Sequence, residues 1–322
     1  MEKIAEKLAP ELSKLESFLT SSLRTEVGFI RTVSEYVIKA GGKRIRPILL
    51  ILSCRLCGDT SDRYLPYAAS IEFIHTATLL HDDVIDDAKV RRGKSTANVL
   101  FGNPSTILIG DFLYSRAFDL MVSEGSREIL AIMARATNLL SEGEILELIM
   151  TGNVELKEEE YLEIIEKKTA VLFSAACEIG AILGAAPSDK REALSELGRS
   201  LGLIFQIKDD VLDYTSSEQI LGKKIGTDLK EGKVTLPLIK ALREANRRER
   251  VYLERVLRKK APAFEDFERV RGVIEKYNGI AYALSLCLEL AKKAREELLA
   301  FPDNPYRQDL LALIDYLVER ER

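Results

Sequence analysis

Two aspartate clusters of the same form, DDxxD, are the residues of this chain whose types and spacing could do chemistry. The first consists of Asp82, Asp83 and Asp86 in HDDVIDD, and the second of Asp209, Asp210 and Asp213 in KDDVLDY. Residues four apart share one face of a helix, so the outer aspartates of each cluster repel each other. Carboxylates without thiol or imidazole partners suit Mg²⁺, which also takes waters and substrate phosphates. The clusters predict a diphosphate held through metal between two helices.

Groups of basic residues accompany these acids. Arginine and lysine side chains form charge-assisted hydrogen bonds with phosphate oxygens, and adjacent arginines suit this binding well. Acids and bases together predict metal-bridged diphosphates, two of them, although a charge-balanced helix end is the structural alternative for the first basic group. The groups are Lys89, Arg91, Arg92 and Lys94; Lys223, Lys224, Lys230 and Lys233 in a glycine-rich segment; Lys43, Arg44 and Arg46 in GGKRIRP; and Lys168 beside Thr169.

Other phosphate and hydrolase chemistries are excluded by missing motifs. The chain has no G-x-x-x-x-G-K-[ST] loop and no calcium loop of the D-x-[DN]-x-[DN]-G form. It also has no G-x-S-x-G turn. His75 and His81 are its two histidines, and they are too close together for a histidine–aspartate phosphohydrolase.

The elements that must position these residues are helices. Apolar residues recur every three or four positions in segments such as ALSELGRSLGLIFQIKDDVLDY, whereas alternating strand patterns are scarce. Nine prolines punctuate the helical segments, and no linker, low-complexity tract or regular repeat interrupts them. We therefore expect one all-α domain over residues 1–322, with roughly a dozen helices.

Composition narrows the function classes. The 322 residues are 46% hydrophobic and carry a net charge of −4, which argues against a general nucleic-acid binder. The four cysteines fit a reducing compartment, and Cys54-x-x-Cys57 lacks the further ligands of a zinc site. The N-terminus is charged and amphipathic, and no long apolar run suits a membrane span. These features predict a soluble, cytoplasmic protein.

The motifs together resemble the trans-isoprenyl diphosphate synthases, most closely the octaprenyl-type polyprenyl synthases. They occur in the family's order between residues 41 and 237: GGKRIRP, IHTATLLHDDVIDDAKVRRGKSTAN, GDFLYSRAF, KKTAVLF, FQIKDDVLDY and GKKIGTDLKEGKVTLP. The resemblance implies an all-α fold around a deep central cavity, a homodimer, and a prenyltransferase. Such an enzyme condenses isopentenyl diphosphate with an allylic diphosphate, and its product is delivered to a membrane.

The resemblance also implies a role for each matching residue. Asp82 and Asp86 would ligate two Mg²⁺ ions, with Asp83 in the same catalytic set, and Asp209 would hold a third ion supported by Asp210 and Asp213. The allylic diphosphate would contact Arg91, Lys168, Lys233 and one of Lys223 or Lys224. Isopentenyl diphosphate would contact Lys43, Arg46, His75 and Arg92. Thr169 and Gln206 would lie near the reacting carbons.

The helix before the first cluster predicts the product length. Thr78 and Ala77 lie about one helical turn, roughly 5.4 Å, before Asp82, and both are small. Ile74 and Ile71 follow on the same face, whereas family members with short products carry an aromatic residue in the first turn. We expect a product of about C30 to C45, because each isoprene unit adds roughly one helical turn of length. A side chain of the segment from Phe112 to Phe118 would block the growing product chain and so set its final length.

Three other functions remain possible from the sequence. A terpene cyclase or head-to-head synthase shares metal-bound diphosphate chemistry, but a cyclase has no need of GGKRIRP. A non-catalytic subunit of a heteromeric synthase would be expected to lose aspartates or cations that this chain retains. A farnesyl- or geranylgeranyl-type synthase would differ only in stopping at about C15 to C25, a product about as long as a few helical turns.

Overall fold

The computed structural model describes residues 1–215, 226–259 and 262–320, and it confirms the all-α class. The chain forms two compact units. Unit 1 consists of Met1–Thr137, Leu172–Gly198 and Leu298–Leu313, and unit 2 of Asn138–Val171, Arg199–Glu297 and Ile314–Arg322. The expectation of a single domain over residues 1–322 stays a prediction.

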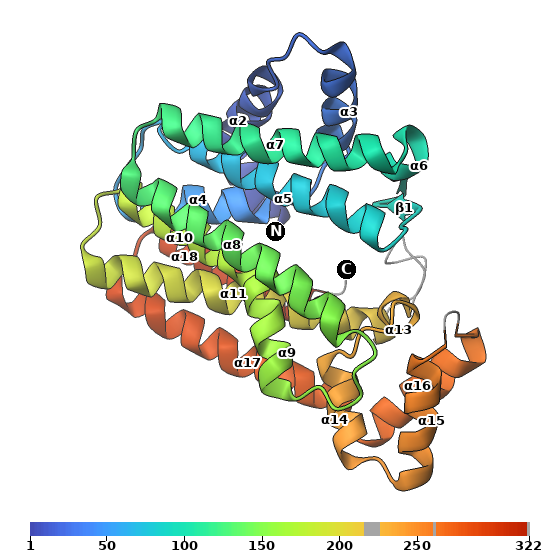
Figure 1. The fold of residues 1–322 in the computed structure, drawn as a ribbon. Coiled ribbons are helices and arrows are strands. Elements are labelled where there is room, and N and C mark those ends of the chain that lie inside the picture. Colours follow the sequence, from blue (N-terminus) through green and yellow to red (C-terminus); the bar gives the residue numbers. More distant parts are fainter. Residues whose placement is uncertain (216–225, 260–261, 321–322) are drawn as a thin grey trace. The chain divides into compact units, whose positions relative to one another are not determined.

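Unit 1 contains the first seven helices (Figure 1). They are α1 (Glu2–Lys7), α2 (Ala9–Ser22), α3 (Gly28–Lys39), α4 (Ile45–Leu56), α5 (Leu65–Ile85), α6 (Ala97–Phe101) and α7 (Asn103–Ser123). The unit also holds β1 (Val90–Arg91), β2 (Lys94–Ser95) and η2 (Leu298–Ala300), most of α10 (Val171–Leu183), and the first parts of α8 (Arg127–Met150), α11 (Ser188–Thr215) and α18 (Pro305–Glu319).

Helices α5 and α7 lie side by side and position the first aspartate cluster (Figure 1). Ser70 of α5 donates a hydrogen bond to the Ala117 carbonyl of α7 at 3.0 Å. Gly110 permits close approach, because a Cβ there would lie 2.4 Å from Nε2 of His81. Helix α5 begins with Pro66 in its first turn and ends at the cluster itself.

The two-residue strands β1 and β2 were not predicted, since strands this short have no detectable alternation. They pair antiparallel, Val90 with Ser95 and Arg91 with Lys94. Both turn residues have positive φ, 53° at Arg92 and 73° at Gly93, as a type I′ hairpin turn requires. This hairpin fixes the direction in which the two arginines project.

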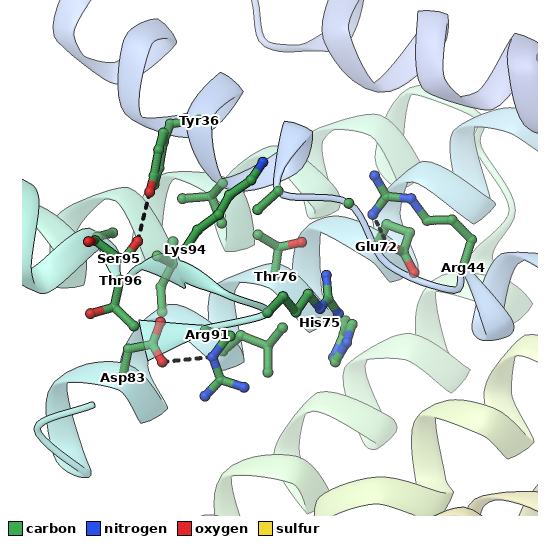
Figure 2. A pocket seen from close by; sticks show the side chains of 17 residues that line it. Tyr36, Arg44, Glu72, His75, Thr76, Asp83, Arg91, Lys94, Ser95 and Thr96 are labelled. Carbon is green, nitrogen blue, oxygen red and sulfur yellow. Dashed lines mark hydrogen bonds and ion pairs between the residues drawn. The ribbon is translucent and has the colours of Figure 1, made fainter. Parts of the chain in front are cut away.

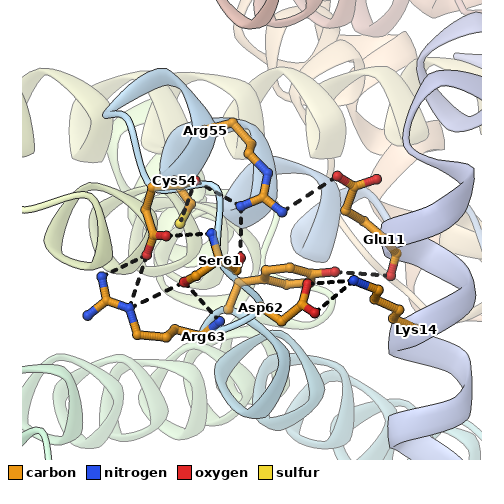
Figure 3. Close-up of polar contacts among 9 residues, drawn as sticks. Glu11, Lys14, Cys54, Arg55, Ser61, Asp62 and Arg63 are labelled. Carbon is orange, nitrogen blue, oxygen red and sulfur yellow. Dashed lines mark hydrogen bonds and ion pairs between the residues drawn. The ribbon is translucent and has the colours of Figure 1, made fainter.

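Arg55 organises the loop that joins α4 to α5 (Figure 3). Its Nη1 donates hydrogen bonds to the carbonyls of Asp59, at 2.8 Å, and Ser61, at 2.9 Å. Burial raises the pKa of the nearby Cys54 thiol to about 12 and that of Cys57 to about 11. Both thiols therefore stay protonated near pH 7.

Unit 2 contains the remaining elements. They are α9 (Glu158–Ile165), the π-helix η1 (Glu166–Ala170), α13 (Thr227–Lys230), α14 (Leu236–Glu244), α15 (Arg247–Leu257), α16 (Phe264–Lys276), α17 (Gly279–Glu297) and the later parts of α8, α11 and α18. Gly202 of α11 lets η1 pack closely, because a Cβ there would lie 2.4 Å from Cα of Ala170. None of the helices in the described residues combines the length and apolarity needed to cross a bilayer.

Candidate active site

The first aspartate cluster occupies the last turn of α5 in unit 1. The Asp86 amide donates a hydrogen bond to the Asp82 carbonyl at 2.8 Å, so the turn is still helical there. Asp82 and Asp86 are both half-buried and share a helix face. Asp83 is buried and accepts a 2.7 Å hydrogen bond from Nε of Arg91. Burial raises the pKa of Asp83, and the Arg91 guanidinium opposes this shift. Asp83 thus fixes Arg91, and the outer two aspartates stay the predicted metal ligands.

A cavity of about 50 Å³ in unit 1 is lined by histidine and arginine side chains (Figure 2). His75, Arg91, Arg92 and Arg44 all reach it. Burial, and then the charges of Arg46, Arg92, Arg91 and Arg44, lower the pKa of His75 well below its ordinary value. The imidazole is therefore neutral near pH 7 and can still donate one N–H. A neutral donor among several guanidinium groups is an arrangement suited to binding an anion.

The GGKRIRP segment follows α3 and continues into the first turn of α4. Arg44 has a left-handed backbone, with φ of 49°, and its guanidinium is clamped by two carboxylates. Nη1 pairs with Glu72 of α5 at 2.6 Å, and Nε pairs with Glu16 of α2 at 2.7 Å. Lys43 is exposed, and the Arg46 guanidinium lies over the Phe173 ring, 4.7 Å from its centre. Arg44 and Glu72 thus anchor the loop that carries the two predicted substrate-binding cations.

The three residues predicted to set the product length lie along α5. Ile74 and Ala77 are fully buried. Thr78 is partly exposed, and its hydroxyl donates a 2.8 Å hydrogen bond to the His75 carbonyl. The site role of all three stays a prediction.

The second aspartate cluster lies near the end of α11 in unit 2, and its three members have different surroundings. Asp209 is half-buried and pairs with Nη2 of Arg320 at 2.6 Å. Asp210 is buried and accepts hydrogen bonds from the Tyr161 hydroxyl, at 2.6 Å, and from Nε2 of Gln206, at 2.9 Å. Burial raises the pKa of Asp210 to about 7, against the effect of these two donors.

Asp213, the last member, is buried and caps a helix. Its carboxylate accepts backbone N–H bonds from Thr227 at 3.2 Å and from Asp228 at 3.0 Å, both in the first turn of α13. A carboxylate at a helix N-terminus is favoured by the orphan amides and the helix dipole. Asp213 therefore fixes the segment that leads to Lys233.

Lys168 and Thr169 lie on the π-helix η1, an irregularity that is frequent at functional sites. Nζ of Lys168 pairs with Glu144 at 2.7 Å and with Glu147 at 2.6 Å. Nζ of Lys233 lies 3.6 Å from the same Glu147 carboxylate. Although burial opposes the shift, the two lysines lower the pKa of Glu147, so this carboxylate stays ionised between them. Two cations are thereby gathered at one place.

A polar chain connects these residues to the aspartates. The Thr169 hydroxyl donates to Oε1 of Gln206 at 2.9 Å, and Gln206 donates in turn to Asp210. A cavity of about 100 Å³ in unit 2 is lined by Lys168, Gln206, Asp210 and Lys233, among others. Lys223 and Lys224 lie outside the described residues.

Sequence reasoning missed several residues of this constellation. Glu144 and Glu147 stand three apart on α8 and so share a face, a pattern that the sequence does display. Tyr161 precedes Lys168 by two helical turns, which is a weaker signal. Arg320 gives no sequence signal, because it lies 111 residues from Asp209.

The carboxylates fit a magnesium site that the substrate completes. Within the described residues, no three His, Cys, Asp or Glu side chains are gathered to enclose a metal ion by themselves. Mg²⁺ keeps several waters and takes substrate phosphate oxygens, so one or two carboxylates from the protein suffice. Asp82 and Asp86 in unit 1, and Asp209 in unit 2, are partly exposed oxygen donors of this kind.

Comparisons with known proteins place the chain in a family. The sequence profile of the family named Polyprenyl synthetase matches residues 27–274. The octaprenyl diphosphate synthase of Escherichia coli (strain K12) is 38% identical over 322 residues, which cover 100% of this chain and 99% of that protein.

Solved structures agree over the full length. A polyprenyl synthase from Caulobacter crescentus CB15, complexed with calcium and isoprenyl diphosphate, superimposes with a TM-score of 0.95 at 40% identity, covering 100% of this chain and 98% of that one. A decaprenyl diphosphate synthase from Rhodobacter capsulatus superimposes with a TM-score of 0.94 at 40% identity. The match covers 100% of this chain and 99% of that one. The chain therefore belongs to the polyprenyl synthetase family of trans-prenyltransferases.

Proposed function

We propose that the chain condenses isopentenyl diphosphate with an allylic diphosphate, head to tail and in the trans configuration. The product is a long-chain all-trans polyprenyl diphosphate of about C30 to C45, each unit adding roughly one helical turn of length. The observation that carries this proposal is the pairing of two aspartate motifs with separate groups of cations in a member of this family. Product formation from the two diphosphates by the purified chain tests it.

On the allylic side, Asp82 and Asp86 would hold two Mg²⁺ ions and Asp209 a third. When bound, Mg²⁺ stabilises the charge that develops on the departing diphosphate. Lys168, Lys233, Arg91 and one of Lys223 or Lys224 bind the same group. Glu147 keeps the two ammonium groups of Lys168 and Lys233 together before substrate arrives. Positive charge is thus in place before the C–O bond breaks, which is where preorganised charge contributes most.

Lys43, Arg46, His75 and Arg92 bind the diphosphate of isopentenyl diphosphate. Neutral His75 donates one hydrogen bond, and the arginines supply charge. Thr169 and Gln206 lie beside the reacting carbons, where their mutual hydrogen bond fixes both side chains. The double bond attacks the allylic carbon, and the departing diphosphate takes the proton that is lost. The reaction needs no separate general base from the protein.

We predict that Ala77→Tyr shortens the main product towards C15 to C20, because an aromatic ring about one helical turn below the metals stops the tail. Thin-layer or mass analysis of the dephosphorylated products measures this. The control is Val122→Tyr, at a 58% exposed position near the C-terminal end of α7. An unchanged product distribution in Ala77→Tyr would show that Ala77 only packs helices.

We also propose a homodimer. Exposed apolar side chains gather on α3, α6 and α7 of unit 1, where the rings of Phe29 and Tyr36 both contact Phe101, at 6.1 Å and 5.8 Å. The exposed members are Val27, Phe29, Val99, Leu100, Ile107 and Leu108. Exposed apolar side chains that gather in this way are typical of association surfaces, which supports a dimer formed through this face.

Leu108→Glu should therefore halve the mass measured by sedimentation velocity, because Leu108 is 65% exposed and a buried unpaired charge opposes association. Val122→Glu, at a 58% exposed position near the other end of α7, is the matched control and should leave the dimer intact. A wild-type monomer, or equal dissociation in the control, would contradict this interface.

A cytoplasmic location, a single domain and delivery of the product to a membrane are parts of the same proposal. All four cysteines are free, which supports a reducing compartment. The shorter-chain synthase and the non-catalytic subunit are the alternatives that the turnover experiment decides.

A further inference from the structure

The segment from Lys240 to Lys260 has a charge opposite to that of the chain. It contains nine lysines and arginines against three glutamates, whereas the chain as a whole has a net charge of −4. This excess of positive charge is carried by α15 and the residues that flank it in unit 2.

Nearby side chains already neutralise all three glutamates. Glu244 pairs with Lys240 at 2.6 Å, and Glu249 pairs with Lys276 at 2.6 Å. Glu254 pairs with Arg250 at 3.2 Å. The remaining arginines of the segment are therefore not balanced by its own acids.

These arginines form one stripe along α15. Arg248, Val251, Arg255 and Arg258 follow one another at spacings of three and four residues, so they share a helix face. All four are exposed, Val251 by 59%. Within the described part of the chain, none of the three arginines forms an ion pair. The Arg255 and Arg269 guanidinium groups lie 5.2 Å and 4.0 Å from the centre of the Tyr252 ring, which brings a cation of α16 beside the stripe.

An exposed aromatic residue links this neighbourhood to the second aspartate motif. Phe264, in the first turn of α16, is 62% exposed, and its ring contacts that of Phe267 at 6.4 Å. Phe267 stacks on Tyr214 at 6.1 Å with an interplanar angle of 2°. Tyr214 directly follows Asp213, so the row of rings runs from the surface to the motif.

We propose that the exposed face of α15 and the start of α16, defined by Arg248, Val251, Arg255, Arg258 and Phe264, docks on an anionic phospholipid bilayer. Guanidinium groups bind headgroup phosphates, and the interspersed apolar side chains enter the headgroup boundary. Charge complementarity favours an anionic bilayer as the partner of this face, because polybasic surfaces bind anionic lipid. The purpose of docking rests on the proposed function, since a long polyprenyl diphosphate belongs in a bilayer, but the binding itself does not require turnover.

Co-sedimentation with vesicles tests the proposal. The full-length chain, without substrates, is mixed with vesicles of phosphatidylcholine alone or with phosphatidylglycerol added. We expect binding to the anionic vesicles only, weakened by salt. Arg248→Glu/Arg255→Glu should reduce the partition coefficient at least about 20-fold, since each basic residue contributes roughly fivefold. Phe264→Ser should reduce it by a smaller factor.

Lys292→Glu/Lys293→Glu on α17 is the matched control, because it changes the net charge equally at an exposed surface. It should retain most of the binding. Equal binding to neutral vesicles, equal loss in the control pair, or tighter binding of a single-stranded polynucleotide than of anionic vesicles would overturn the proposal. Turnover measured separately in detergent shows whether the condensation itself fails, so the two failures are distinguishable.

Discussion

Asp82→Asn should lower kcat about a thousandfold while the helical circular dichroism and the unfolding midpoint stay near those of the wild type. Asp82 and Asp86 share the face of the last turn of α5, and a metal ligand supplies several kcal/mol of transition-state stabilisation. About 4 kcal/mol corresponds to a factor of a thousand in rate. The side-chain shape is retained and only the charge is lost, so the effect reports the carboxylate itself. Steady-state kinetics over a Mg²⁺ titration measure it.

Asp87→Asn is the matched control, at the aspartate that directly follows the cluster. Asp87 is exposed, pairs with Lys89 at 2.6 Å and has a φ of 49°, which asparagine tolerates. Its kcat should stay within about threefold of the wild type, the usual range for an exposed pair. Near-normal turnover in Asp82→Asn at ordinary Mg²⁺ concentration would contradict the metal assignment. Equal losses of kcat in both variants would show that the loss of negative charge, and not of a metal ligand, lowers the rate.

Arg46→Met should raise KM for isopentenyl diphosphate about 30-fold and leave KM for the allylic diphosphate within about threefold. A charge-assisted hydrogen bond to a diphosphate contributes roughly 2 kcal/mol, which is about that factor. Methionine replaces the guanidinium over the Phe173 ring with an unbranched, polarizable side chain that also packs well on aromatic rings, so we expect the fold to be retained. Initial rates with each substrate varied in turn measure the two constants.

Lys43→Met should have the same direction of effect, because it flanks the same anchored loop. Arg31→Met, at an exposed arginine of α3 in the same unit, should change neither constant. If Arg46→Met raised both constants equally, the two diphosphates would not have separate cation groups.

The sequence predicted the helices that carry both aspartate motifs, because apolar periodicity and DDxxD spacing are local properties. It also pointed to Lys168, Thr169, Gln206 and Lys233, through motifs that resemble a family. In the structure Thr169 and Gln206 are hydrogen-bonded and both lysines contact Glu147, while their roles in the reaction stay predictions.

The individual roles within each motif could not be predicted, because they depend on tertiary partners. Asp83, Asp210 and Asp213 look like their neighbours in sequence, yet they are buried against Arg91, Tyr161 and the first turn of α13. The hairpin that directs Arg91 has strands too short to show alternation. The clamp on Arg44 joins it to carboxylates from two helices, and no local pattern encodes it.

The most direct test of the account is the length of the product made by the purified chain alone. The chain is incubated with Mg²⁺, isopentenyl diphosphate and a farnesyl or geranylgeranyl diphosphate primer. The dephosphorylated products are then separated by chain length. We expect repeated condensation to all-trans products of about C30 to C45, with one isoprene unit, roughly as long as one helical turn, added in each step. No condensation would contradict the enzyme assignment and favour a non-catalytic subunit. A main product that stops at about C15 to C20 would contradict the long-chain assignment, because such a tail would extend along only a few turns of α5.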